Sequence, residues 1–271
     1  MNDSFSLDGK VIVVTGGTGV LGKSFISCIA EVGGTVGILG RNRKMAEESA
    51  TRINRCGGKA IALCADVTKR NELNNARKLM LDTYGKIDGL VNAAGGIFHE
   101  GIIEDNGDIL NLNINGLKKV MDLNLWGTVL PTQVFGEAII RNGEGVIVNI
   151  SSLAAKRVIS GIMGYGLAKS AVEYFTKGIA VELSRKHGDA IRINAIVPGF
   201  FTADQSTKLL SGTKKAIEKH NNEILKRTPF KRLGGCDELN GTLIWLLSRA
   251  SKFVTGTTVI VDGGFNINSG I

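Results

Sequence analysis

The chain has 271 residues and a formal net charge of +8, and 43% of its residues are hydrophobic and 21% charged. This composition is typical of a globular protein with a substantial core and argues against disorder. Basic residues are spread along the chain, no run of 18 apolar residues occurs and the N-terminus lacks a signal-peptide pattern, so we predict a cytoplasmic protein that binds neither nucleic acid nor membrane.

The cysteines are scattered along the sequence. Cys28, Cys56, Cys64 and Cys236 form no CxxC pair, and no histidine lies at ligand spacing from them. We therefore predict reduced thiols, no disulfide framework and no metal site.

Seven short apolar, β-branched runs predict strands, and amphipathic segments between them predict helices. The strands are expected at residues 10–15, 35–39, 60–65, 87–93, 145–151, 191–197 and 257–263. Apolar strands that alternate with helices are typical of a parallel sheet covered on both faces. We therefore predict an α/β fold, a Rossmann-like doubly wound seven-stranded parallel sheet, as a single domain over residues 1–271.

Residues 199–235 interrupt this alternation, because no strand is evident there and the pattern predicts two polar helices. An insertion beyond the carboxyl end of a strand is well placed to cover a substrate. The alternative is a surface helical hairpin without function.

The stretch TGGTGVLG, residues 15–22, follows the first predicted strand. Such a glycine-rich turn before a helix lets backbone N–H groups face a pyrophosphate, although it can also serve only helix packing. Val20 stands where these turns usually carry glycine. We expect Val20 to pack at the start of the helix, with the N–H groups around Thr18 and Gly19 facing the phosphates.

The second predicted strand ends in Gly40, followed by Arg41, Asn42 and Arg43. A carboxylate at this point favours NAD, because it binds the adenosine ribose and repels a 2′-phosphate. With the acid missing and two guanidinium groups nearby, we predict a preference for NADP(H), with NAD(H) as the alternative. The alternative is that Arg41 and Arg43 are solvent-exposed residues at the start of a helix and bind no cofactor.

Tyr165 and Lys169 are four residues apart, so on a helix they share one face. Alone the pair is weak, because such pairings arise easily by chance. Upstream, however, lie NAAG at 92–95, LNLWG with Asn124 in a predicted helix, and NISS at 149–152.

The glycine turn, NAAG, helical asparagine, serine and YxxxK, in this order, resemble the short-chain dehydrogenase/reductase superfamily from about Phe5 to the end of the chain. The resemblance implies that Tyr165 is the general acid/base, Lys169 its activator, Ser152 the group that polarises the substrate carbonyl and Asn124 the holder of a relay water. It also implies a homotetramer. The cofactor contacts we expect are Gly16, Thr18, Gly19, Val20, Leu21, Gly22, Arg41, Asn42, Asp66, Val67, Asn92, Ala93, Gly95, Tyr165, Lys169, Val197, Pro198, Gly199 and Thr202.

A phenol is a poor base at neutral pH, since its reference pKa is about 10. Lowering that pKa by about 3 units requires on the order of 4 kcal/mol of preferential phenolate stabilisation. An ammonium group and an oxidised nicotinamide nearby are expected to supply it.

Several stretches, including MDLNLWGTVLPTQVF, NAAGGIFHE, VPGFFTADQ and VDGGFNINSGI, are similar to the D-mannonate oxidoreductases, or fructuronate reductases, of the short-chain type. Gly40 departs from that group, which carries an acid there. Gluconate 5-dehydrogenases and 3-oxoacyl thioester reductases are alternatives. So is an NADP-sensing regulator without activity, although the complete catalytic set argues against it.

A sugar acid needs a cationic partner for its carboxylate. Lys156 or Arg157 is expected to clamp it, unless both are solvated surface charges, and Lys208 lies on the insertion. His99 follows NAAGGIF and is expected to reach the substrate, or to be a plain loop histidine. His187 and His220 are not placed like catalytic residues.

Overall fold

The computed structural model describes residues 3–103, 107–202 and 222–268. Within them one parallel sheet has the strand order β3-β2-β1-β4-β5-β6-β7. The strands are β1 Val11–Thr15, β2 Thr35–Gly40, β3 Lys59–Cys64, β4 Gly89–Asn92, β5 Gly145–Ile150, β6 Ile191–Pro198 and β7 Thr258–Val261. The predicted fold is confirmed, and each strand end lies within two residues of its predicted position.

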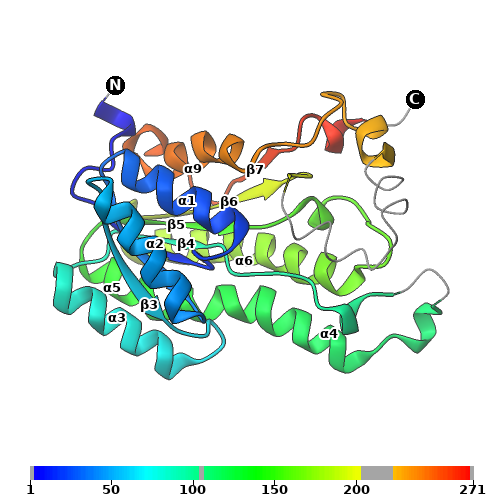
Figure 1. The fold of residues 1–271 in the computed structure, drawn as a ribbon, viewed down its shortest axis with the longest axis horizontal. Helices are drawn as coiled ribbons and strands as arrows, with labels where there is room; N and C mark the ends of the chain where they lie inside the picture. Colours follow the sequence, from blue (N-terminus) through cyan, green and yellow to red (C-terminus); the bar gives the residue numbers. More distant parts are fainter. Residues whose placement is uncertain (1–2, 104–106, 203–221, 269–271) are drawn as a thin grey trace.

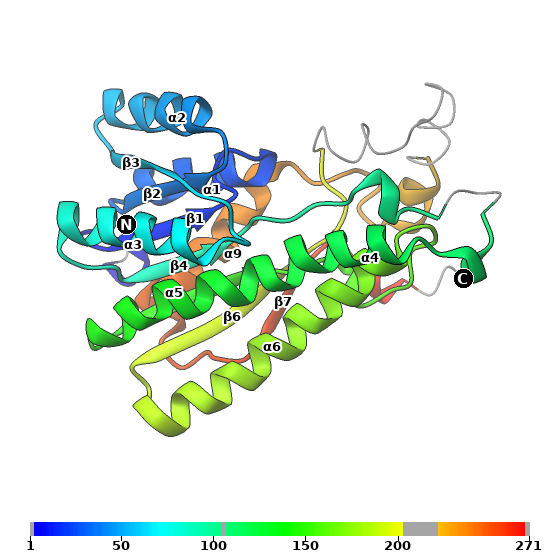
Figure 2. The same cartoon turned by 90° about the horizontal axis from the view of Figure 1, so that it is seen from below.

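Helices cover both faces of the sheet, as Figures 1 and 2 show. One face carries α1, α2 and α9, and the other carries α3, α5 and α6. The helices are α1 Val20–Glu31, α2 Arg43–Arg55, α3 Arg70–Tyr84, α4 Ile114–Met121, α5 Gly127–Arg141, α6 Met163–His187 and α9 Asn240–Leu247.

The apolar strands serve two cores at once, which explains why they lack an alternating polar pattern. In β1, Val11 and Val13 pack toward α3 and α5, whereas Ile12 and Val14 pack toward α1 and α9. All four side chains are at most 5% exposed. Burial on both faces therefore fixes the centre of the sheet.

The chain changes direction at β1, because β2 and β3 lie on one side of it and β4 to β7 on the other. In open parallel sheets a ligand crevice forms at such a switch point, beyond the carboxyl ends of the strands. The loops that follow β1 and β4 diverge at this point. The fold thus places the glycine turn and the NAAG segment at one crevice.

The ends of the predicted insertion are tied together. Phe201 and Gly234 form a parallel bridge, in which Gly234 N donates to Phe200 O at 2.9 Å and Thr202 N to Gly234 O at 2.8 Å. The helices expected between these ends fall largely on residues 203–221, outside the described residues, as do Lys208 and His220. Across the described ranges, no helix combines the length and apolarity of a membrane span.

Candidate active site

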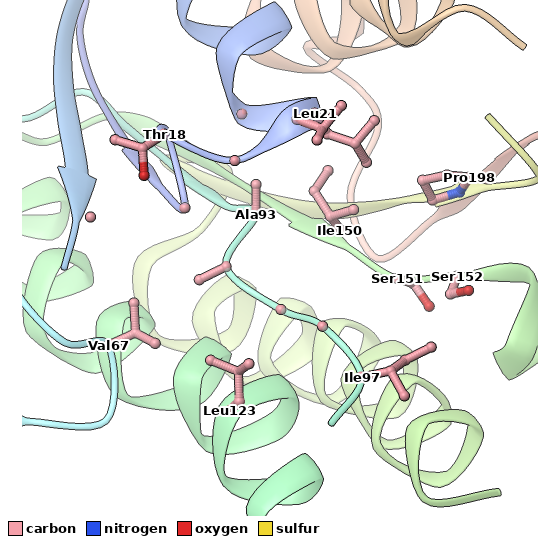
Figure 3. A pocket seen from close by; sticks show the side chains of 18 of the residues that line it. Thr18, Leu21, Val67, Ala93, Ile97, Leu123, Ile150, Ser151, Ser152 and Pro198 are labelled. Atoms are coloured by element: carbon pink, nitrogen blue, oxygen red, sulfur yellow. The ribbon is translucent and has the colours of Figure 1, made fainter. Parts of the chain in front are cut away.

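A cavity of about 370 Å³ opens at the carboxyl ends of β1, β4, β5 and β6. Figure 3 looks across it, from Thr18 at one end to Ser152 at the other. Its described lining comprises Gly16, residues 18–22, 39–41, 65–67 and 93–97, Leu123, residues 150–152, Tyr165, Lys169 and residues 198–201. Most of the predicted cofactor and catalytic residues therefore border one space.

The glycine turn forms one end of the cavity, and its glycines are required sterically. Gly16 has φ +64°, and a Cβ there would lie 2.8 Å from the backbone of Ala94. A Cβ on Gly22 would lie 2.1 Å from Gly16 O, so only glycine lets α1 start this close to the turn. The turn is a cradle of backbone into which a phosphate group fits.

Helix α1 begins at Val20, as predicted, and Val20 lines the cavity. The expectation for Gly19 is wrong, because its N–H donates to Gly16 O at 2.9 Å within the turn. The N–H groups that a helix leaves unpaired are those of its first turn, here from Val20 to Gly22. These groups, rather than Gly19 N–H, are the donors that the turn offers.

Of the three residues after β2 that were considered for binding a 2′-phosphate, only Arg41 lies at the cavity. Arg41 is exposed and lines the cavity. Asn42 instead caps α2, where its side chain accepts from Met45 N at 3.1 Å, and it is absent from the lining. Arg43 lies 3.7 Å from Glu47 on the exposed face of α2. Helix capping thus explains Asn42 without a ligand.

Gly40 lies against the glycine turn, since a Cβ there would lie 2.9 Å from Thr18 Oγ1.

The carboxylate of Asp66, after β3, is held by Thr68, whose N and Oγ1 donate hydrogen bonds to Asp66 Oδ1 at 2.8 and 2.7 Å. Burial alone would raise the pKa of Asp66, but these hydrogen bonds and the charge of Arg41 lower it overall. Asp66 is therefore an anionic acceptor at this end of the cavity.

Asn92 does not line the cavity, contrary to expectation. It is 1% exposed, and its Nδ2 donates to Thr132 Oγ1 and Asn149 Oδ1, both at 2.9 Å. The amide ties β4 to β5 and α5 beneath the site. Its neighbours Ala93 and Gly95 do line the cavity, so the NAAG segment contributes backbone and small side chains there.

Ser152, Tyr165 and Lys169 meet at the other end of the cavity. Tyr165 and Lys169 lie in the first two turns of α6, and the Lys169 Nζ lies 5.5 Å from the centre of the Tyr165 ring. The Lys169 ammonium donates to Ile150 O at 2.8 Å. Ser152 hydrogen-bonds to Tyr165, and its Oγ also accepts from Ala154 N at 3.2 Å. The predicted trio is thus assembled around one point.

Burial shifts the pKa values of Tyr165 and Lys169. It raises the pKa of Tyr165, and the hydrogen bond with Ser152 offsets only part of that shift. It lowers the pKa of Lys169 to about 8. At neutral pH, Tyr165 is therefore a protonated phenol and Lys169 an ammonium, so the protein alone does not supply the low phenol pKa expected from sequence.

Asn124 lies in a π-helical turn, Asp122–Trp126, between α4 and α5. Its Oδ1 accepts from Gly96 N at 3.0 Å, and its Nδ2 donates to Gly96 O at 2.7 Å. A Cβ on Gly95 would lie 2.8 Å from Asn124 Oδ1 and 3.2 Å from Lys169 Nζ. The Asn124 side chain is therefore committed to the backbone of the segment that follows β4, beside Lys169.

The end of β6 and the segment after it border the cavity through only two of the four residues expected there. Pro198 and Gly199 line it, but Val197 is fully buried in β6 and Thr202 bonds to Gly234 O instead. Phe200 and Phe201 line the cavity and were missed. Two adjacent aromatic residues directly after a strand that ends at the crevice were the available signal.

The three residues expected to bind substrate lie outside the described lining. The Lys156 ammonium pairs with Glu173, and the Arg157 guanidinium donates to Asn266 O. Because these cations already have partners, the structure does not support the carboxylate clamp. His99 is exposed in a short 3-10 helix, His99–Gly101.

In the part of the chain that the structure describes, no three His, Cys, Asp or Glu side chains gather closely enough to hold a metal. The cavity offers instead a phosphate cradle at one end and a proton donor at the other. The two lie in one continuous space.

Comparisons with known proteins agree with this geometry. A family model described as enoyl-(acyl carrier protein) reductase matches residues 20–266. The uncharacterized oxidoreductase UxuB of Bacillus subtilis is 35% identical over 275 residues, which cover 98% of this chain and 98% of UxuB. The family model begins at Val20, inside the glycine turn, and includes Ser152, Tyr165 and Lys169 at the other end of the cavity.

Two solved structures are also similar over 98% of this chain and 98% of their own. A candidate D-mannonate oxidoreductase from Haemophilus influenza, with bound NAD, has a TM-score of 0.89 and 34% identity. A gluconate 5-dehydrogenase from Burkholderia cenocepacia, in complex with NADP and tartrate, has a TM-score of 0.87 and 30% identity. The two proteins were thus solved with different dinucleotides.

Proposed function

Because this chain belongs to the short-chain dehydrogenase/reductase family and is an oxidoreductase of that family, we propose that it uses NADP(H) to interconvert a keto sugar acid and a hydroxy sugar acid, such as D-fructuronate and D-mannonate. One observation carries the proposal. Ser152, Tyr165 and Lys169 converge at one end of a cavity whose other end is a glycine cradle.

The residues present fit a dinucleotide. The cradle around Gly16 and Gly22 leaves no room for a Cβ, and Asp66 is an anionic acceptor beside it. When bound, the cofactor supplies or removes the hydride. The segment from Pro198 to Phe201 would border its nicotinamide end, next to Ser152 and Tyr165.

The proton step falls to Tyr165. In reduction, its phenol donates a proton to the carbonyl oxygen, and the Ser152 hydroxyl donates a hydrogen bond to the same oxygen. Because burial keeps Tyr165 protonated, the site is prepared for the reductive direction. The Lys169 ammonium then stabilises the phenolate that remains.

The proposed preference for NADP(H) rests on Gly40 and Arg41. No carboxylate follows β2 to repel a 2′-phosphate, and the exposed guanidinium of Arg41 lines the same end of the cavity. A guanidinium and a phosphate form charge-assisted, bidentate hydrogen bonds.

A second function is favoured by one specific feature, the apolar part of the cavity lining. Ile97, Leu123, Phe200 and Phe201 line the cavity, and Lys169 is the one cation that the described lining provides beside Tyr165. Such a surface suits an acyl chain, so reduction of a 3-oxoacyl thioester is the alternative. A sugar acid is favoured instead by the candidate mannonate oxidoreductase and gluconate dehydrogenase relatives.

Initial rates separate these functions. D-fructuronate, 5-keto-D-gluconate and an acetoacetyl thioester are each tested with NADPH and with NADH. We expect the highest kcat/KM for D-fructuronate with NADPH. A higher value for the thioester assigns the second function, and binding of NADPH without turnover of any of the three carbonyls assigns a sensor.

We propose a cytoplasmic homotetramer as the working form. Leu167, Tyr174 and Val181 are spaced seven residues apart on α6 and are 50%, 80% and 56% exposed. This spacing puts them on one face of the helix, where a second copy would bury them. Sedimentation at micromolar concentration tests the assembly, and a monomer with Tyr174 still exposed contradicts it.

A further inference from the structure

Glu173 is a buried carboxylate that the proposed proton transfer does not use. It lies one turn after Lys169 on α6 and is 5% exposed. Its Oε1 accepts from Ser151 Oγ at 3.1 Å, and its Oε2 accepts from the Lys156 ammonium. A carboxylate at this depth requires a counter-charge and hydrogen-bond donors, and Lys156 and Ser151 supply them.

Lys169 is not the partner of Glu173. The Lys169 ammonium turns toward β5 and donates to Ile150 O at 2.8 Å, whereas Lys156 reaches Glu173 from the loop after β5. Lys156 also lies 3.5 Å from Thr258 Oγ1 at the start of β7. The ion pair therefore joins the loop after β5 to α6 behind the site.

Ser151 connects this ion pair to the reacting groups. Its N–H donates to Ile196 O at 2.8 Å, and its hydroxyl lies 3.1 Å from Glu173 Oε1 and 3.3 Å from Lys169 O. The carboxylate is both the nearer and the stronger acceptor. Ser151 directly precedes Ser152, as Figure 3 shows at the end of β5, so its side-chain bond restrains the Ser152 backbone.

We propose that Glu173, neutralised by Lys156, is a positioning residue that holds Ser152 against Tyr165 through Ser151. The inference rests on the proposed function, in which Ser152 and Tyr165 donate to one oxygen. Ser152 is extended, with φ −164° and ψ 155°, and its Oγ accepts from Ala154 N. Its single hydroxyl proton is therefore directed correctly only while the backbone before it is held in place.

The phenol of Tyr165 reports this positioning without any ligand. The hydrogen bond with Ser152 lowers the pKa of Tyr165, so a displaced Ser152 raises it. Ser151→Ala removes only the hydroxyl and adds or removes no ionisable group, and Lys169 loses its proton before Tyr165 titrates in wild type and variant alike. Alkaline absorbance titration, with the curve of Tyr165→Phe subtracted, isolates this tyrosine from Tyr84 and Tyr174.

We expect the pKa of Tyr165 to rise in Ser151→Ala and by a similar amount in the charge-balanced variant Lys156→Met/Glu173→Leu. Adding Ser151→Ala to that double variant should produce little further shift, because both act through one bond. Ser170→Ala is the matched control, since its exposed hydroxyl bonds to Gly166 O on the same helix. Circular dichroism confirms that each variant remains folded.

Turnover of D-fructuronate with saturating NADPH is the second measurement. Misplacement of a reacting group lowers kcat more than it raises KM, and we expect Ser151→Ala to lower kcat about tenfold with KM within about twofold. If wild type turns over none of the panel, the proposed function has failed and the titration alone decides. If alkali unfolds the protein before Tyr165 titrates, kcat decides.

The proposal is overturned if Ser151→Ala leaves both the Tyr165 titration and kcat unchanged while the melting temperature falls, because Glu173 then only stabilises the fold. A titration that shifts without a change in kcat also overturns it. In that case Ser152 moves, but its position does not matter to the reaction.

Discussion

The two ends of the cavity are built from different material. The end at Thr18 consists of a backbone turn whose glycines exclude any Cβ. The end at Ser152 consists of side chains from α6 and from the residues that follow β5, supported by the ion pair between buried Glu173 and half-buried Lys156. We therefore expect added atoms to impair cofactor binding at the first end, and the loss of functional groups to impair turnover at the second.

Tyr165→Phe removes one functional group from the side-chain end. General acid catalysis contributes about 10²–10⁴-fold, so we expect kcat to fall about 1,000-fold while the NADPH dissociation constant stays within about twofold. Tyr84→Phe, at the end of α3 and outside the described cavity lining, is the control. A variant that keeps a tenth of wild-type turnover would remove Tyr165 from the reaction.

Gly22→Ala adds one atom at the backbone end, 2.1 Å from Gly16 O. The forced shift costs roughly 1–3 kcal/mol, so we expect the NADPH dissociation constant to rise about 10- to 100-fold. Gly178→Ala on α6, where a Cβ meets nothing within 4 Å, should leave binding unchanged. Calorimetric titration checks both variants, and equal affinities would contradict the cradle.

Lys156→Met distinguishes two roles of Lys156, the ion pair with Glu173 and the substrate-carboxylate clamp expected from sequence. Leaving Glu173 buried and unpaired costs roughly 3 kcal/mol, so we expect the free energy of unfolding in urea to fall by about that amount. Lys78→Met removes an exposed partner of Asp82 and should change little. A large rise in KM for D-fructuronate with unchanged stability would restore the clamp.

Arg41→Ala tests whether the Thr18 end of the cavity recognises the 2′-phosphate that distinguishes NADPH from NADH. Loss of a charge-assisted hydrogen bond should raise the NADPH dissociation constant about tenfold and leave that for NADH within about twofold. Arg43→Ala, whose guanidinium lies against Glu47, is the matched control. An equal loss of both cofactors would show that Arg41 does not contact a 2′-phosphate.

The pH dependence follows from Lys169, with a pKa of about 8 in the folded chain. Above that pH the ammonium is lost, so kcat/KM for reduction should decline. In the unfolded chain the pKa of this lysine is about 10.4. Burial of the charged Lys169 therefore lowers the free energy of unfolding by its full amount below pH 8. This loss becomes smaller between pH 8 and 10.4, so the free energy of unfolding rises with pH there. Lys169→Met should remove that gain in unfolding free energy, and an unchanged slope would contradict the assignment.

The difference between a backbone turn and a set of side chains from distant elements also explains which features could be predicted from the sequence. Strand positions, the glycine turn and the start of α1 at Val20 follow from local pattern and sterics. The choice of ion-pair partner does not, because Lys156 and Glu173 are 17 residues apart and meet only when α6 packs against the turn at residues 153–155. Asn42 and Asn92 were likewise assigned to the cofactor, although one caps a helix and the other joins strands.

Transfer of deuterium tests directly whether a carbonyl is reduced in this cavity. NADPH deuterated at its transferable position is incubated with wild-type protein and D-fructuronate, with Tyr165→Phe in parallel, and the products are analysed by mass spectrometry. We expect one deuterium on the new carbinol carbon with wild type, and almost none with Tyr165→Phe. NADPH that binds but remains unoxidised with every carbonyl of the panel would contradict it.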